Sequence, residues 1–293
     1  MLDYHYETFL TVCKTLNYTR AGELMNMSQP AVSQHIAYLE DQLDTKLFIY
    51  KNKKLSLTEE GRYLYNKLLW MENFSKKTLE ELGEINFTKV NLGCTLSISD
   101  YLVPSFFIDM FHKEKGFRLN VLVENTETLV NYLVQGKIDG AFVEGDFNQR
   151  VFSSIPYKEA RIVGICSPDF ELADKQVSFQ DLFNKQIIIR EPGSGTRSSF
   201  ETILANEQIE LSSFKNQTIL GSIDLIKRVV ESNVGISFLF DVCVEKELEE
   251  GTLKKLDFGY EFEAKMLNFI YLTSNPTTDF ILRMEESFQR TSH

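Results

Sequence analysis

Residues 18–58 contain the pattern that most limits what this chain can fold into. The segment YTRAGELM predicts a short helix that opens at Thr19, whose hydroxyl can accept one of the unpaired N–H groups of a helix start. This helix is expected to bury Ala21 and Leu24. The following MNMSQP predicts a tight turn into a second helix. A helix-turn-helix unit is therefore expected here.

The second helix of this unit is expected to have one apolar and one polar face. Ser28 is its predicted cap, and Pro30 lies in the first turn, where a missing N–H costs nothing. Four apolar side chains follow at spacings of three and four: Val32, Ile36, Leu39 and Leu43. Gln29, Ser33 and Gln34 then point away from this stripe.

Short amide and hydroxyl side chains on the outer face of such a helix suit hydrogen bonding to base edges in a major groove of DNA. For a single Gln or Ser, an ordinary solvated position is the better interpretation. The combination with helix caps and a basic two-stranded wing favours DNA binding. The wing carries Lys51, Lys53 and Lys54 between Phe48 and Leu55.

A long helix is predicted to run from its cap at Thr58 to about Phe87. A stripe of alternating spacing four and three runs along it: Leu64, Leu68, Met71, Ser75, Thr78, Leu82 and Ile85. Such a stripe suits pairing with a second copy of the helix, although it could also pack on the chain's own body. Pairing is favoured, because a reader of inverted half-sites needs two-fold symmetry.

Short apolar strands alternate with helices from Lys89 onward, which predicts an α/β domain with sheets covered on both faces. The expected strands are VNLGCT, FRLNVLVEN, IDGAFVEG, ARIVGICS, QIIIRE, KNQTILG, VGISFLF and LNFIYLT. The expected helices cover 100–114, 127–136, 197–208, 223–232 and 278–290. Apolar positions from Thr126 to Val143 recur from Ser222 to Leu239, so two similar halves are expected to form a cleft.

Three strand-to-helix junctions are rich in hydroxyl groups, which favour anions at helix N-termini. They are GCTLSIS, REPGSGTRSS and LGSID. Simple helix capping explains any one of them, and Ser198 with Glu201 has the spacing of a capping box. Three junctions on converging strand ends favour a small-molecule site. The run PGSGT lacks the lysine of a nucleotide-hydrolysing phosphate loop.

The segments YTRA, SQPAVSQHIAYLE, KLF and LSLTEEG together resemble the winged helix-turn-helix of LysR-type transcriptional regulators. The resemblance implies a set of DNA contacts: Thr19, Arg20, Ser28, Gln29, Pro30, Ser33, Gln34, Lys51, Lys53 and Lys54. Positions that are often arginine in the family hold other residues here: Gln34, Ala37, Tyr38, Tyr50 and Ser56. Fewer phosphate contacts and stronger limitation by salt are expected.

The loop REPGSGTR resembles a subgroup of that family that includes regulators of sulfur, nitrogen and carbon assimilation. The resemblance implies two Rossmann-like α/β subdomains of periplasmic-binding-protein type behind the all-α head. It also implies effector contacts: Thr95, Ser97, Ile98, Ser194, Gly195, Thr196, Arg197 and Ser222. The expected domains are 1–58 for the head, 59–88 for a dimerising linker helix and 89–293 for effector binding, with subdomain I at 89–162 and 267–293 and subdomain II at 163–266.

Composition bounds the class of protein. The formal net charge is −11, but residues 1–62 carry 7 Lys or Arg against 8 Asp or Glu, so the acidity lies mostly further on. No apolar run reaches the roughly 20 residues of a membrane span, and the start lacks a signal-peptide pattern, so a cytoplasmic protein without membrane contact is expected. The four cysteines lie far apart, which favours small buried hydrophobes over a metal site or a redox pair.

A transcriptional regulator that binds double-stranded DNA as a homodimer or homotetramer is the leading hypothesis, with a small, anionic effector and no cofactor. The alternative is an enzyme or a solute-binding module in which the helix-turn-helix is mere packing. An enzyme needs an acid/base or nucleophilic constellation, and no G-x-S-x-G or HExxH motif occurs. No catalytic residue is assigned. A solute binder would usually be exported.

Overall fold

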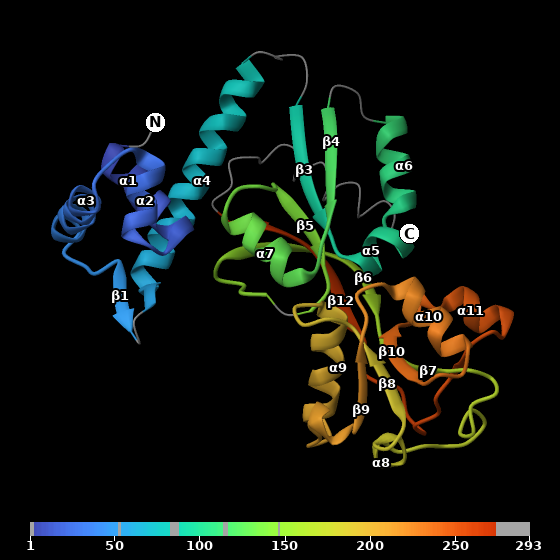
Figure 1. Cartoon of the computed structure of the whole chain (residues 1–293). Helices are drawn as coiled ribbons and strands as arrows, with labels where there is room; N and C mark the ends of the chain where they lie inside the picture. The colour runs from blue at the N-terminus through green and yellow to red at the C-terminus, as the bar shows by residue number, and fades with distance from the viewer. Residues whose placement is uncertain (1–2, 52–53, 83–87, 114–116, 146, 274–293) are drawn as a thin grey trace. The chain divides into compact units, whose positions relative to one another are not determined.

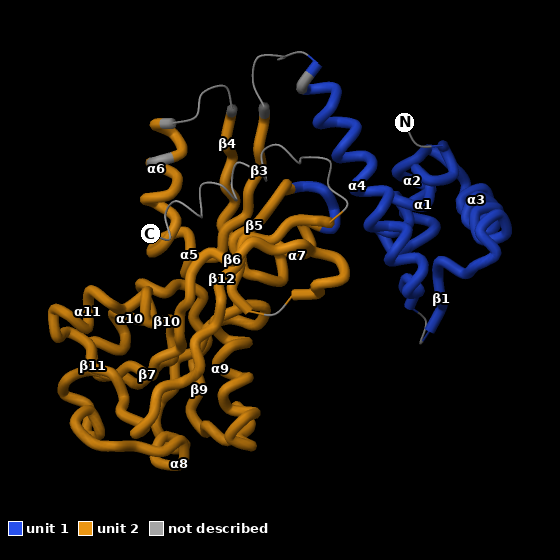
Figure 2. Tube along the Cα trace, turned by 180° about the vertical axis from the view of Figure 1, so that it is seen from behind, with its two compact units in different colours: residues 1–88, 134–137 blue, residues 89–133, 138–293 orange. Residues whose placement is uncertain are grey.

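The computed structural model describes residues 3–51, 54–82, 88–113, 117–145 and 147–273. The chain divides into two compact units, residues 1–88 with 134–137 and residues 89–133 with 138–293 (Figure 2). The smaller unit is called the head below, and the larger is called the α/β unit. Each unit is described separately.

The head is a helical bundle with a two-stranded wing (Figure 1). Its helices are α1 (Tyr4–Thr15), α2 (Tyr18–Met25), α3 (Gln29–Gln42) and the long α4 (Glu59–Leu82). Strands β1 (Phe48–Lys51) and β2 (Lys54–Leu57) form the antiparallel wing, with Phe48 opposite Leu57. The expected winged helix-turn-helix is confirmed.

The caps of α2 and α3 agree only in part with the expectation. Asn17, and not Thr19, caps α2, because the Asn17 side chain accepts a hydrogen bond from the N–H of Arg20. Thr19 lies exposed in the first turn. The expected burial of Leu24 is also wrong, since its side chain is 59% exposed. Ser28 does cap α3, where its Oγ accepts from Ala31 N at 3.4 Å.

The apolar stripe of α3 packs into the core of the head, with one exception. Val32, Ile36 and Leu39 are buried, whereas Leu43 is 40% exposed because α3 ends there. The first half of the α4 stripe also serves this core, where Leu68 is buried. Large apolar side chains are exposed elsewhere on α4: Tyr63, Met71, Phe74, Leu79 and Leu82. Ile85 lies outside the described residues.

The junction between the wing and α4 is tightly built. Thr58 Oγ1 donates to Lys46 O at 2.7 Å and accepts from Gly61 N at 2.9 Å, so it caps α4 as expected. Gly61 passes so close to the wing that an added Cβ would lie 2.0 Å from Leu47 O. This close approach explains a glycine inside a helix, where it otherwise costs about 1 kcal/mol relative to alanine.

Histidines join α1 to α3 at the surface of the head. His35 Nδ1 lies 2.8 Å from Thr8 Oγ1, and His5 stacks on Tyr38 with ring centroids 4.4 Å apart. His5 Nδ1 also lies 2.6 Å from Asp3 Oδ1. Partial burial, and then the neighbouring His5, lower the pKa of His35, whereas Asp3 opposes this shift.

Within the described residues, the α/β unit contains two five-stranded sheets. The first has the order β4-β3-β5-β12-β6, with β3 (Thr88–Cys94), β4 (Phe117–Val123), β5 (Gly140–Val143), β6 (Phe152–Ala160) and β12 (Lys265–Leu272). The second has the order β11-β7-β10-β8-β9, with β7 (Ile162–Cys166), β8 (Gln186–Ile189), β9 (Asn216–Ile219), β10 (Ile236–Phe240) and β11 (Lys254–Lys255). The chain thus crosses between sheets at Arg161 and again between β11 and β12.

Helices cover these sheets and bury their apolar faces in one core. They are α5 (Leu96–Tyr101), α6 (Pro104–Lys113), α7 (Thr126–Val134), α8 (Phe179–Leu182), α9 (Gly195–Asn206), α10 (Ile223–Glu231) and α11 (Glu245–Glu250). In Figure 1, α7 lies beside the first sheet and α9 beside the second. The expected pair of α/β subdomains is confirmed.

Some predicted elements differ from the structure. The single helix expected over 100–114 is the separate helices α5 and α6, because Pro104 begins a new helix. Strand β6 was not expected, since Pro156 and polar residues interrupt its apolar pattern. It lies at the edge of its sheet, where such residues are tolerated, and its register shifts beside Pro156. The helix expected at 278–290 lies outside the described residues.

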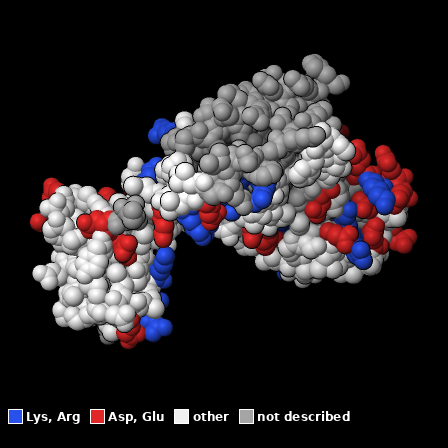
Figure 3. All heavy atoms as spheres, turned by 90° about the horizontal axis from the view of Figure 1, so that it is seen from above, with Lys and Arg blue, Asp and Glu red and all other residues white. Residues whose placement is uncertain are grey.

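Charge and cysteines are distributed largely as the composition suggested. Figure 3 shows acidic side chains gathered at the end of the α/β unit where α11 carries the sequence EKELEE.

All four cysteines are free and buried, and burial raises the pKa of Cys13 to about 12 and that of Cys166 to about 11. Over the described part of the chain, no helix combines the length and apolar character needed to cross a membrane.

We predict that Gly61→Ala destabilises the head, because the new Cβ meets a backbone carbonyl that cannot rotate away. The free energy of unfolding should fall by about 1–3 kcal/mol, which is typical of overpacking. Thermal or urea unfolding measures the change. Glu60→Ala, one residue earlier and exposed, is the matched control and should stay within about 0.5 kcal/mol. Equal stability of the two variants would contradict the packing argument.

We also predict that the head loses stability as the pH falls below about 6.5, the ordinary pKa of histidine. The folded state holds the pKa of His35 below that value, so the unfolded chain takes up a proton first. Thermal unfolding at pH 7.5 and pH 5.5 tests this. The drop should shrink in His35→Asn and remain in His112→Asn, which alters an exposed histidine of α6. An undiminished drop in His35→Asn would exclude His35 as the source.

Candidate functional site

The head presents one candidate site at the N-terminal end of α3. Gln29, Pro30 and Gln34 are exposed and Ser33 is half-buried. By helical spacing, Pro30 and Gln34 lie away from the buried stripe, whereas Gln29 and Ser33 lie at its edge in the first turns of the helix. No hydrogen bond of the Gln29, Ser33 or Gln34 side chain is found within the described residues. Their amide and hydroxyl groups are thus open to an external partner, as direct readout of base edges requires.

Basic groups of the head are few and partly engaged. Arg20 Nη1 forms an exposed ion pair with Glu23 Oε2 at 2.8 Å, so a phosphate would have to compete with Glu23. Lys51 and Lys54 are exposed on the wing strands, whereas Lys53 lies outside the described residues. Tyr50, which directly precedes Lys51, is 73% exposed. This surface is suited to hydrogen bonding more than to a high density of phosphate contacts.

The second candidate site lies where strands of the two sheets end in the α/β unit. Strands β3 and β5 are parallel neighbours, and their carboxyl ends lead to Thr95 and Glu144. Strand β8 of the second sheet leads to Arg190 and then to α9. Carboxyl ends of parallel strands are where open α/β sheets receive ligands.

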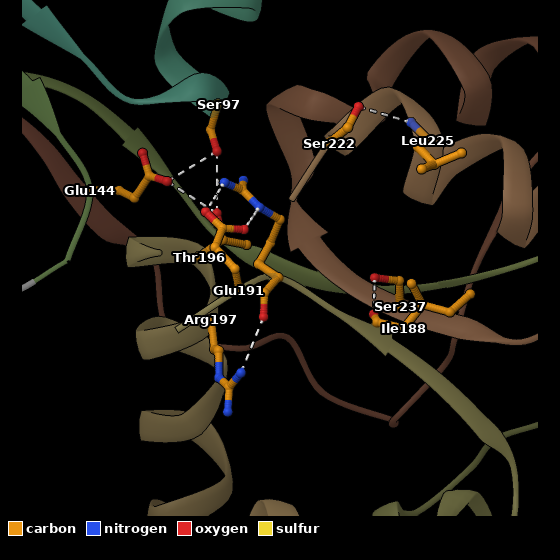
Figure 4. Close-up of polar contacts among 10 residues, drawn as sticks. Ser97, Glu144, Ile188, Glu191, Thr196, Arg197, Ser222, Leu225 and Ser237 are labelled. Carbon is orange, nitrogen blue, oxygen red and sulfur yellow. Dashed lines mark hydrogen bonds and ion pairs between the residues drawn. The ribbon is translucent and has the colours of Figure 1, made fainter. Parts of the chain in front are cut away.

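A buried carboxylate joins these strand ends. Thr95 Oγ1 donates to Glu144 Oε2 in a short hydrogen bond, and Ser97 Oγ donates to Glu144 Oε1 at 3.1 Å. From the second sheet's side, Thr196 Oγ1 donates to the same Oε1 at 3.1 Å. Figure 4 shows Ser97 and Thr196 both directed at Glu144. The hydroxyls expected to receive an anion therefore hold a carboxylate of the chain itself.

The environment of Glu144 opposes its ionisation. Its side chain is 1% exposed, and desolvation is the largest influence, raising its pKa above the ordinary value. The hydroxyl donors and the positive charge of Arg190 lower the pKa, but less than burial raises it. Thr126 Oγ1 fixes the backbone by donating to Glu144 O at 3.0 Å. Burial of this group is thus tolerated through hydrogen bonds and a nearby cation.

Arg190 and Ser194 leave donors unused beside this cluster. Arg190 binds Glu191 in a two-pronged ion pair, with Nε and Nη2 at 2.8 and 2.9 Å from the carboxylate oxygens. Its Nη1 is buried without a hydrogen-bond partner, and so is Ser194 Oγ. A buried donor without an acceptor costs about 1–3 kcal/mol. Such donors are typical of a site that receives a water or a ligand.

A cavity of about 540 Å³ opens beside the cluster. Its wall contains Glu144 and Ser194 together with charged side chains of α7 and α9. The lining is Thr126, Glu127, Val130, Glu144, Gly145, Phe147, Asn148, Phe152, Pro192, Gly193, Ser194, Gly195, Arg197, Ser198 and Glu201. This volume is within the range of small-molecule sites.

The remaining expected effector contacts have varied surroundings. Gly195 packs against Glu144, where an added Cβ would lie 2.3 Å from Glu144 O. Arg197 lines the cavity but pairs with Glu201 at 2.8 Å. Ile98 is buried in the core. Ser222 caps α10 by accepting from Leu225 N, apart from the Glu144 cluster in Figure 4.

The capping box expected from Ser198 and Glu201 is wrong, because α9 begins three residues earlier. Ser194 occupies the N-cap position and Gly195 is the first helical residue. The carboxylate of Glu201 is instead engaged by Arg197, one turn before it. Ser198 therefore lies inside the first turns of the helix, at the wall of the cavity.

The residues that the sequence did not single out are Glu144, Arg190 and Thr126. A usable signal existed for the first two. Glu144 ends the buried run GAFV, and Arg190 ends the buried run QIII, so each places a charge directly after an interior strand. Thr126 gave no signal beyond an ordinary helix start. Among the described residues, no cluster of His, Cys, Asp and Glu could hold a metal ion.

Comparisons with known proteins identify both units. Residues 4–62 match the family of bacterial regulatory helix-turn-helix proteins of the lysR type, and residues 87–286 match the LysR substrate binding domain. A probable RuBisCO transcriptional regulator of Trichormus variabilis is 30% identical over 246 residues, which is 81% of this chain and 72% of that protein. The uncharacterized HTH-type transcriptional regulator YeiE of Escherichia coli K12 is 28% identical over 250 residues, covering 85% of this chain and 84% of YeiE.

Solved structures share the fold at low identity. A full-length OxyR variant from Pseudomonas aeruginosa has a TM-score of 0.61 at 18% identity, covering 99% of this chain and 95% of that one. The CcmR regulatory domain from Synechocystis PCC6803, in complex with 2-PG, has a TM-score of 0.62 at 19% identity, covering 70% and 97%. With a DNA-reading head and an effector-binding α/β unit, this chain belongs to the LysR family of transcriptional regulators.

Proposed function

We propose that this chain binds promoter DNA as a homodimer or homotetramer in the cytoplasm and responds to a small, anionic effector without catalysing a reaction. The observation that carries the DNA assignment is the open polar face of α3, whose amide and hydroxyl groups have no partner within the described residues. The effector assignment is supported by the cavity beside the Glu144 cluster. One structural neighbour, the CcmR regulatory domain, is in complex with 2-PG.

The proposed DNA contacts remain those expected from the sequence. Base edges would be read by Gln29, Pro30, Ser33 and Gln34, and Ser28 would hold the helix start. The phosphate backbone would be contacted by Thr19, Arg20, Lys51, Lys53 and Lys54. Because Arg20 already pairs with Glu23, we expect modest non-specific affinity.

The proposed effector contacts are Thr95, Ser97, Ser194, Gly195, Thr196 and Arg197. Ile98 and Ser222 are left out, because one is a core residue and the other a helix cap. The domain division is proposed as 1–58, 59–88 and 89–293, with subdomains 89–162 with 267–293 and 163–266. An effector between the subdomains would favour one of their arrangements and so change how the heads meet DNA.

Self-association is supported by the exposed apolar side chains of α4. Met71 and Leu82 are 51% and 66% exposed and lie on one side of this helix, eleven residues apart. Large exposed apolar groups on a helix are typical of a pairing surface. Two-fold pairing would also place two copies of α3 for two half-sites.

We predict that Gln29→Ala weakens operator binding by about fivefold to 150-fold, the range for loss of a bidentate amide contact to a base. Ser33→Ala should weaken it less, because it removes one hydrogen bond. Gel shifts on promoter fragments at low and high salt measure the affinity. Gln42→Ala, at the exposed far end of the same helix, is the matched control and should bind normally. Full operator binding by Gln29→Ala and by Ser33→Ala, with unchanged melting temperature, would refute the assignment of α3 to the major groove.

We predict that Met71→Glu with Leu82→Glu shifts the protein toward monomer, because four carboxylates would then face each other across the proposed seam. Analytical ultracentrifugation over a range of concentrations measures the assembly. Lys76→Glu changes the net charge by the same amount away from the seam and should leave the assembly intact. An unchanged assembly in the double variant would place the interface elsewhere.

A further inference from the structure

The corner of the cleft around Glu144 is built from hydrogen-bond donors. The hydroxyls of Thr95, Ser97 and Thr196 donate to its carboxylate, and the Arg190 guanidinium acts on it electrostatically. The start of α9, with the partial positive charge of a helix N-terminus, packs directly against Glu144 at Gly195. Without Glu144, this corner would be a receptor for an anion.

Unused donors indicate that the corner can accept more oxygen atoms than the Glu144 carboxylate offers. Ser194 Oγ and Arg190 Nη1 are buried without a partner, in residues that are 3% and 5% exposed. Ser194 also lines the cavity, so an occupant of the corner could reach both the hydroxyl cluster and the cavity. Compact oxyanions present several acceptor oxygens at once and suit such a set of donors.

We infer that the Glu144 carboxylate is a tethered occupant of this corner and that the effector is a compact oxyanion which binds by displacing it. The inference rests on the proposed function, because it names the ligand class of the same cleft. In the structure as it stands, Glu144 satisfies the hydroxyls from both subdomains. An effector oxyanion takes over these hydrogen bonds and adds those that Ser194 and Arg190 leave unmade.

The cavity gives the displaced side chain a place to go. Glu144 and the following Gly145 both line it, and Gly145 has a φ of 90°, which is easily adopted only by glycine. Arg197 lies in the same wall and can form an ion pair with the Glu144 carboxylate once that side chain has rotated out of the corner. Water in the cavity would solvate the released carboxylate, which is buried in its present position.

Glu144 competes with a free oxyanion for the hydroxyl donors because the backbone holds it beside them. The Glu144 side chain and a free oxyanion cannot accept from the same hydroxyl donors at once, and an ionised Glu144 would also repel the oxyanion, because charges in this buried corner are poorly screened. A group held in place by the backbone competes at an effective concentration in the millimolar range or above. Removing the Glu144 carboxylate should therefore raise the affinity for a free oxyanion by about tenfold or more.

Isothermal titration of the full chain with sulfate, phosphate and acetate, at constant ionic strength with chloride, tests the inference. The wild type should bind weakly, Glu144→Ala at least about tenfold more tightly, and Glu144→Gln in between, because an amide keeps the shape but not the charge. Sulfate and phosphate against acetate distinguish a tetrahedral oxyanion from a carboxylate. Adding Thr196→Val to Glu144→Ala should remove the gain.

Glu127→Gln is the matched control, since it removes a negative charge from the cavity wall without touching the hydroxyl cluster. A similar gain in Glu127→Gln would show a general charge effect and overturn the inference. Glu144→Gln provides the answer if Glu144→Ala does not fold. No gain in either folded variant, or stabilisation of the wild type by amines alone, would also overturn it.

Gel shifts with the same proteins separate this inference from the proposed function. Suppose that Glu144→Ala gains no oxyanion affinity but promoter binding by the wild type still responds to a small molecule. The displacement of Glu144 is then refuted, and the proposed regulatory function is retained. If neither protein binds promoter DNA while the gain in oxyanion affinity is seen, the proposed function is refuted, and the displacement of Glu144 is retained.

Discussion

The α/β unit depends on the burial of one acidic side chain at the meeting point of its two sheets. A carboxylate deprived of water is costly unless donors surround it, and Thr95, Ser97 and Thr196 supply them from both subdomains. Because these donors come from separate segments of the chain, their hydrogen bonds to Glu144 link the two halves of the cleft beside the shared apolar core. A polar contact of this kind can be exchanged for another anion, which an apolar interface cannot do.

Local sequence rules predicted most of the head and failed at single positions such as Thr19 and Leu24. The stripe of Val32, Ile36 and Leu39 and the cap at Ser28 follow from periodicity and helix-start chemistry, and both are present. Thr19 was chosen as a cap although Asn17, two residues earlier, offers a better acceptor and takes the role. Leu24 has the right type for a core residue, but its place on the helix faces outward.

The cleft could be predicted only in outline, because its central contact joins distant positions. Hydroxyl-rich junctions on strand ends predicted an anion site, and in the structure three of these hydroxyls donate to the buried side chain of Glu144. The role of Glu144 could not be predicted from the sequence, since its partners lie 47 to 52 positions away and the pairing depends on how two sheets meet. The signal that remained was a glutamate directly after an apolar strand, a position where an unpaired charge is rarely tolerated.

The two units solve opposite electrostatic problems within one acidic chain. The head must approach a polyanion, and it does so with few cations, one of which, Arg20, is already paired with Glu23. We propose that it reads bases through the uncharged amides and hydroxyls of α3, whose contacts do not depend on the release of counterions. In the α/β unit, buried donors surround Glu144, and a low dielectric strengthens each of these hydrogen bonds. An acidic regulator is thus compatible with both partners when recognition is short-ranged.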